Sequence, residues 1–120
     1  MLVHQLLANE GILLIRPDGP IAAGDFELVA KTVDPYIENK GTLRGVMIEA
    51  PSFPGWDSFA ALMSHLCFVR DHHRFVAKVA AVSDSPILSI APEIAKHFVQ
   101  AEVRHFNATD RDAALAWLRE

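Results

Sequence analysis

The chain has 120 residues, of which 51% are hydrophobic and 22% are charged, and its formal net charge is −4 at pH 7. These values are typical of one globular domain without a disordered tail. Nucleic-acid binding requires a basic face, whereas the 11 lysine and arginine residues are scattered along this chain. The composition therefore argues against a nucleic-acid partner.

Cysteine usage and the amino-terminal segment limit the cellular location. Cys67 is the only cysteine, so one chain forms no internal disulfide and no thiolate metal cage. The apolar runs near the N-terminus are too short to cross a bilayer, and they lack the basic segment of a signal peptide. We therefore expect a cytoplasmic protein without an integral membrane segment.

The first predicted element is a β-hairpin. Short apolar runs span residues 2–7 and 12–15, with Asn9-Glu10-Gly11 between them. Two apolar runs joined by such turn-forming residues are typical of antiparallel strands. Pro17-Asp18-Gly19-Pro20 then ends the second strand.

A helix and a buried strand are predicted next. From Asp25 to Ile37 apolar residues recur at helical spacing, with Asp25 as the candidate N-cap and Gly41 as the end. Pro35 lies inside this helix and should kink it. Residues 45–50 are apolar on both faces, as expected of a central strand in a parallel sheet.

Helices and strands continue to alternate in the second half. Residues from Trp56 to Cys67 form an apolar helical stripe, on which we expect Cys67 to be inert core. A buried strand is predicted at 75–82, a helix at 86–98 with Ser85 as its N-cap, and a strand at 102–106.

The last predicted helix begins at Thr109-Asp110-Arg111-Asp112, which has the spacing of a capping box, and buries Ala114, Trp117 and Leu118. The full order is β-β-α-β-α-β-α-β-α. Such alternation predicts a single α/β domain with a mostly parallel five-stranded sheet, an antiparallel first strand and about four helices.

Four segments in this order resemble one protein family: LRGVMIEA, GWDSFAALMSHLCFV, RFVAKVAAVSD and AEVRHFNATDRDAALAWL. They are similar to the SpoIIAA-like family, small bacterial proteins with a STAS/SEC14-type fold. The resemblance covers nearly the whole of residues 1–120, and the last segment is the most specific. It implies the fold and leaves the activity open.

The resemblance implies a regulatory hypothesis. STAS-domain antagonists of anti-sigma factors carry a phosphorylatable serine in a DSSG-like motif at the start of a helix. Here Asp57-Ser58-Phe59-Ala60 stands at that place, and Ser58 matches the first serine of the motif. A helix N-terminus also suits a phosphate. Phe59 and Ala60 replace the second serine and the glycine, and the alternative is that Asp57 and Ser58 only favour the first helical turn.

The resemblance also implies a carrier hypothesis, because SEC14-like domains hold lipids in a hydrophobic cavity between sheet and helices. The residues that would line such a cavity are Trp56, Phe59, Met63, Ile90, Ile94 and Phe98. The alternative is that these residues fill the core.

Two further surfaces are candidates for binding. Ser83 and Ser85 lie at the carboxyl end of a predicted parallel strand, where α/β sheets bind ligands, so they could bind an anion or merely cap a helix. Phe53 and Trp56, if exposed, would form an apolar patch for a protein partner, for which a homodimer is the simplest explanation.

The run Arg70-Asp71-His72-His73-Arg74 suggests a metal site at first sight. His65 and His72 could share a helix face, but His73 then points about 100° away. We interpret the run as the charged end of a helix, where cations complement the helix dipole. No Gly-x-Ser-x-Gly or Gly-x-Gly-x-x-Gly motif occurs.

We therefore expect no catalytic residue, no metal and no cofactor. The sequence predicts a non-enzymatic binding or regulatory module acting through residues 51–59. The alternative is a carrier of a small hydrophobic ligand.

Overall fold

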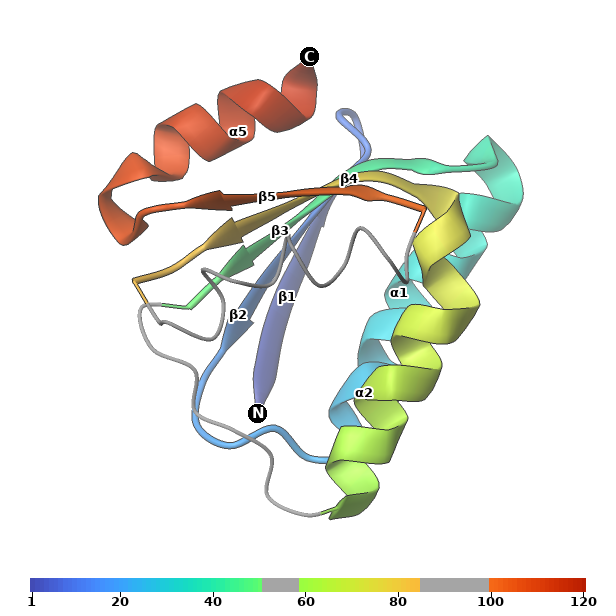
Figure 1. The fold of residues 1–120 in the computed structure, drawn as a ribbon. Helices are drawn as coiled ribbons and strands as arrows, with labels where there is room; N and C mark the ends of the chain where they lie inside the picture. The colour runs from blue at the N-terminus through green and yellow to red at the C-terminus, as the bar shows by residue number, and fades with distance from the viewer. Residues whose placement is uncertain (51–58, 85–99) are drawn as a thin grey trace.

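The protein is built on a five-stranded mixed sheet. The computed structural model describes residues 1–50, 59–84 and 100–120. The strands are β1 (Leu2–Leu7), β2 (Ile12–Pro17), β3 (Leu43–Glu49), β4 (Val76–Val82) and β5 (Glu102–Phe106). They lie in the order β1-β2-β3-β4-β5, with β1 antiparallel to β2 and the other neighbours parallel (Figure 1). The predicted sheet is confirmed.

Helices cover both faces of this sheet. They are α1 (Asp25–Lys40), α2 (Phe59–His72) and α5 (Arg111–Arg119). The first two lie together on one face, and α5 crosses the other (Figure 1). This arrangement follows because successive crossovers of one hand between neighbouring parallel strands place their helices on the same face. The helix predicted at 86–98 falls outside the described residues.

The opening hairpin forms as predicted. Leu7 pairs with Ile12 across it, and the amide of Gly11 donates to the carbonyl of Leu7 at 2.8 Å. Gly11 has φ 69°, a left-handed conformation that glycine adopts without strain. The glycine therefore has a definite role in closing the turn.

The larger core lies between the sheet and the pair α1 and α2. Side chains alternate between the two faces along a strand, so Leu13 and Ile15 of β2 face α1 while Ile12 faces α5. The fully enclosed members of this core include Leu13, Val29, Val33 and Leu43, each at most 1% exposed.

The second core lies under α5. Ala114, Trp117 and Leu118 are buried there against Met47, as the sequence predicted. Gly45 of β3 makes this close approach possible, because a Cβ at that position would lie 2.6 Å from Cδ2 of Leu118. Cβ atoms essentially never lie so near another carbon, so a side chain at position 45 would force the buried side chain of Leu118 to shift.

A row of stacked rings joins α1 to α2. Phe26 stacks on His65 with ring centroids 4.7 Å apart, and Phe68 stacks on His72 at 4.1 Å. The nitrogen Nε2 of His72 lies 2.7 Å from Oδ1 of Asp34. His65 and His72 thus share one helix face, as expected, and α2 ends at His72 as a charged terminus.

Three predictions, on Cys67, on the N-cap of α1 and on the capping box before α5, were wrong. Cys67 was expected in the core, but its side chain is exposed. The face of α2 that packs on α1 carries His65 and Phe68. Adjacent helical residues are about 100° apart, so Cys67 points away from this face.

The N-cap of α1 was also predicted wrongly. It is Gly24, while Asp25 is the first helical residue, and its carboxylate accepts a hydrogen bond from the amide of Ala22 at 2.8 Å.

The third error is the capping box. A 3₁₀ turn at Ala108–Asp110 precedes α5, and the N-cap Asp110 makes no side-chain hydrogen bond to the helix. The tighter turn changes the approach of the chain to the helix, so the spacing of Thr109 and Asp112 no longer places both side chains at the cap.

We expect the substitution Gly45→Ala to lower the free energy of unfolding by about 1–3 kcal/mol, because the new methyl group overpacks against Leu118. Urea unfolding measures this effect. The matched experiment repeats the substitution in a Leu118→Ala background, where the clash is removed. The cost should then fall by at least about 0.5 kcal/mol. Equal costs in the two backgrounds would contradict the assigned contact.

We also expect a pH-dependent contribution from His65. Burial against Phe26 lowers the pKa of His65 from 6.5, so the unfolded chain binds the proton more readily than the folded one. The free energy of unfolding should therefore decrease as pH falls below about 6.5. The substitution His65→Phe keeps an aromatic ring and removes the titration. It should give a shallower dependence of stability between pH 7 and 5, and an unchanged slope would exclude this role.

Candidate functional site

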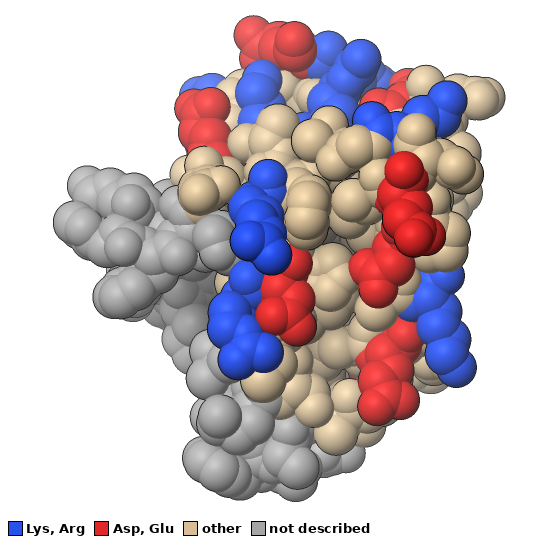
Figure 2. Space-filling view, turned by 90° about the vertical axis from the view of Figure 1, so that its right-hand side faces the viewer, with Lys and Arg blue, Asp and Glu red and all other residues tan. Residues whose placement is uncertain are grey.

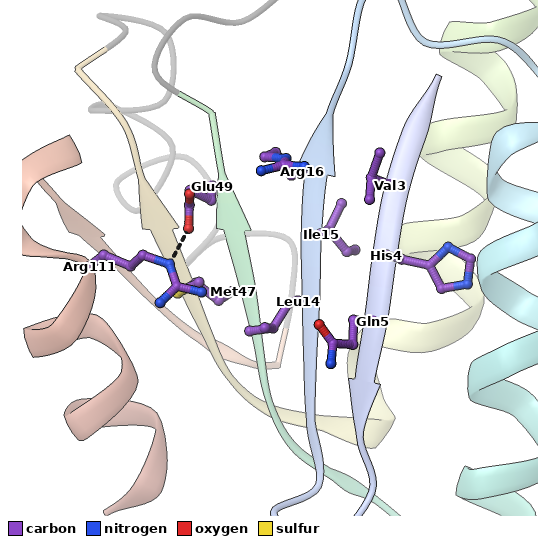
Figure 3. A pocket seen from close by; sticks show the side chains of 9 residues that line it. All are labelled: Val3, His4, Gln5, Leu14, Ile15, Arg16, Met47, Glu49 and Arg111. Carbon is purple, nitrogen blue, oxygen red and sulfur yellow. Dashed lines mark hydrogen bonds and ion pairs between the residues drawn. The ribbon is translucent and has the colours of Figure 1, made fainter.

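A pocket of about 160 Å³ lies beside α5, where this helix leaves the sheet uncovered. α5 packs on β3, β4 and β5 and covers Ile12 of β2. Farther along this face of β1 and β2, Gln5 and Arg16 are exposed. The lining residues are Val3, His4, Gln5, Leu14, Ile15, Arg16, Met47, Glu49 and Arg111 (Figure 3). The pocket thus combines three strands with the first residue of α5.

Strand register arranges the side chains of the pocket in two rows. In one row Gln5, Leu14 and Met47 are direct neighbours across β1, β2 and β3. In the next row Val3 pairs with Arg16. Glu49 belongs to the same row, because it follows the Ile15–Ile48 pair on β3 just as Arg16 follows it on β2. Residues two apart on a strand share a face, so both rows point into the pocket.

The other two lining residues point to the opposite face. Ile15 belongs to the core under α1, and Nε2 of His4 lies 2.9 Å from the hydroxyl of Thr32 in that helix. Figure 3 shows the His4 ring directed toward the helices and away from the pocket. The pocket therefore has apolar walls of Val3, Leu14 and Met47 and a polar rim.

An ion pair forms one side of the rim. Nε of Arg111 donates to Oε2 of Glu49 at 2.5 Å, and the two side chains are 43% and 29% exposed. Arg16 is exposed, and within the described part of the chain its guanidinium has no ion-pair partner. Two cations and one anion thus border the pocket.

Charge is distributed differently on the side of the molecule that carries α1 and α2. Acidic and basic side chains are interspersed over that side (Figure 2). This part of the surface forms no continuous basic field, which nucleic-acid binding would require.

Ser83 was predicted as part of an anion site, and it lies at the carboxyl end of β4 with 0% exposure. Its amide donates to the carbonyl of Phe106 at 3.0 Å, and its carbonyl accepts Nε2 of His105 at 2.6 Å. Asp84 next to it accepts the amide of Ala108 at 3.1 Å. The main chain of Ser83 is thus hydrogen-bonded to Phe106 and His105 of β5. A role for Ser83 in anion binding stays a prediction.

The other predicted site residues are not brought together by the described structure. Phe53, Trp56, Asp57, Ser58, Ser85, Ile90, Ile94 and Phe98 lie outside the described residues. Phe59 and Met63 belong to α2, but their side chains are also outside the description. The carrier cavity and the phosphorylation site stay predictions.

Sequence reasoning missed the residues that border the pocket. Arg16, Glu49 and Arg111 stand at the ends of β2 and β3 and at the start of α5. The available signal was their position, because the carboxyl ends of parallel strands are the usual place for ligand binding in α/β sheets.

Within 1–50, 59–84 and 100–120, no group of three or more His, Cys, Asp or Glu side chains is placed to hold a metal ion. In the same parts of the chain, no helix has the length and apolar character needed to span a membrane.

Comparison with known proteins identifies the family. A solved structure from Shewanella loihica PV-4, described as an uncharacterized protein of the DUF3478 family with a SpoIIAA-like fold, superposes with a TM-score of 0.72 at 19% identity. The match covers 98% of this chain and 92% of that one. No curated protein matches. The SpoIIAA-like family model matches residues 12–119, and the chain therefore belongs to the SpoIIAA-like family.

Proposed function

We propose that this protein is a non-enzymatic cytoplasmic interaction module that binds a protein partner at the carboxyl-terminal edge of its sheet. The SpoIIAA-like fold commonly mediates protein interactions. The single observation that carries the proposal is the pocket beside α5, with its apolar walls and its charged rim formed by Arg16, Glu49 and Arg111. Its contact surface would continue into the segment 51–59.

The size of the pocket favours a protein partner over a carried molecule. Small-molecule sites usually enclose about 300–1,000 Å³, whereas this pocket holds about 160 Å³. A cavity of about 150 Å³ accommodates a benzene-sized group. The space therefore suits one protruding side chain better than a whole lipid.

The chemistry of the lining favours binding over catalysis. No serine, threonine, cysteine, lysine or tyrosine is among the lining residues in the described structure. The one histidine, His4, directs its ring toward Thr32 on the other face. Glu49 is paired with Arg111, which suits an orienting role better than proton transfer.

We propose that the contact surface also includes the segment 51–59, which follows β3 in the chain. Glu49 ends β3 and lines the pocket, and α2 begins at Phe59. The proposal thus joins the pocket to Phe53, Trp56 and Ser58, because these residues come within ten positions of Glu49 in the sequence.

Site-specific photo-crosslinking tests the proposal. A photoreactive phenylalanine analogue at Gln5, on the pocket, should give a discrete protein adduct in the cells that produce the protein. The same analogue at Glu38, exposed on α1, is the control and should give none. Equal adducts at the two positions, or none at Gln5, would contradict the proposal.

Native mass spectrometry of the purified protein identifies competing outcomes of the same test. A co-purifying ligand mass that is lost on denaturation would support the carrier hypothesis instead. A mass of two chains would identify the Gln5 adduct as a second copy, in agreement with an interaction module that forms a homodimer.

We further predict that Ser58→Glu weakens partner binding, because a permanent negative charge within the segment 51–59, which we propose to contact the partner, mimics phosphorylation. Ser58→Ala should leave binding unchanged, since it removes the hydroxyl without adding charge. The yield of the Gln5 adduct measures both variants. An unchanged adduct with Ser58→Glu would remove the phosphorylation hypothesis and leave the pocket hypothesis intact.

A further inference from the structure

We infer that the pocket selects an acidic side chain of the partner and holds its carboxylate between Arg16 and Arg111. This inference rests on the proposed function and adds the chemistry of the group that is recognised. It follows from the donors that the ion pair leaves unused, from the exposure of Arg16 and from the apolar walls.

Arg111 is oriented but not saturated by Glu49. A guanidinium carries five N–H donors in a fixed plane, and the contact with Glu49 uses the one on Nε. The terminal nitrogens lie on the side of Met47 and point away from Glu49 (Figure 3). Glu49 therefore fixes the plane of the guanidinium while its terminal donors stay available to a second carboxylate.

Arg16 supplies the second cation. It is exposed, pairs in register with Val3 on β1, and has no ion-pair partner among the described residues. Glu49 stands one step beyond the Ile15–Ile48 pair, on the adjacent strand and the same face. Among the described lining residues, Arg16 and Arg111 carry two positive charges and Glu49 one negative charge, so this part of the rim has a net positive charge.

The apolar walls below the rim favour an acidic side chain with methylene groups, such as that of glutamate. Val3, Leu14 and Met47 are apolar, so the methylene groups of a glutamate could contact them while its carboxylate reaches the arginines. A lysine or arginine of the partner would meet two cations, and this repulsion disfavours it. The whole chain has a net charge of −4, whereas the two arginines make the rim locally positive. The rim would therefore attract an acidic segment of a partner.

Amide NMR titration with N-acetyl-glutamate N-methylamide tests the inference. The signals of Val3, Gln5 and Met47 should shift and saturate, and the glutamine analogue should produce no such shift. Arg16→Gln and Arg111→Gln should each weaken binding about fivefold, as expected for the loss of one exposed charge contact. Raising the salt concentration should weaken binding to the unmodified protein as well.

The chain offers a matched control on the same helix. Arg119 pairs with Glu10 at 3.0 Å in another exposed Arg–Glu contact, which does not border the pocket. Arg119→Gln should leave the affinity unchanged. An equal loss in this variant, equal binding of the glutamine analogue, or tighter binding of inorganic phosphate than of the glutamate analogue would overturn the inference.

The Gln5 adduct separates this inference from the proposed function. If the adduct forms equally in the original protein and in Arg16→Gln, the pocket binds a partner without reading an acidic side chain, and the inference alone fails. If no adduct forms at Gln5 in either protein, the proposed function fails.

Discussion

The structure depends on the double burial of β3. This strand pairs with β2 on one side and β4 on the other, and its side chains contact α1 on one face and α5 on the other. At Gly45 the absence of a Cβ lets Leu118 of α5 pack directly on the strand. Close packing of this kind helps to position α5, whose first residue is Arg111.

The pocket forms where this coverage ends. α5 packs on β3, β4 and β5, so the strands that lie beyond it expose one face at its edge. Polar side chains are tolerated at that position because they reach solvent, and Arg16 and Glu49 occupy it. The exposed ion pairs of α5, to Glu49 near its start and to Glu10 near its end, contribute little stability.

Family membership and site chemistry answer different questions. The SpoIIAA-like match accounts for the order of the elements and for the sheet. A fold hosts many functions, so the function must be argued from the site. In this protein the site is a pocket of side-chain size at the carboxyl-terminal edge of the sheet, bordered by the guanidinium groups of Arg16 and Arg111.

The sequence alone determined the hairpin, the buried central strands, the charged end of α2 at His72 and the family, because periodicity and turn residues are local properties. It failed at Cys67 and at the capping box, where the rotation of α2 and a 3₁₀ turn override local pattern. Only the tertiary structure brought Arg16, Glu49 and Arg111 together. These residues are far apart in the chain, and their meeting depends on strand register and on the side of the sheet that α5 crosses. Long-range packing of α5 on the sheet, which includes the contact of Leu118 with Gly45, is not encoded in any local pattern.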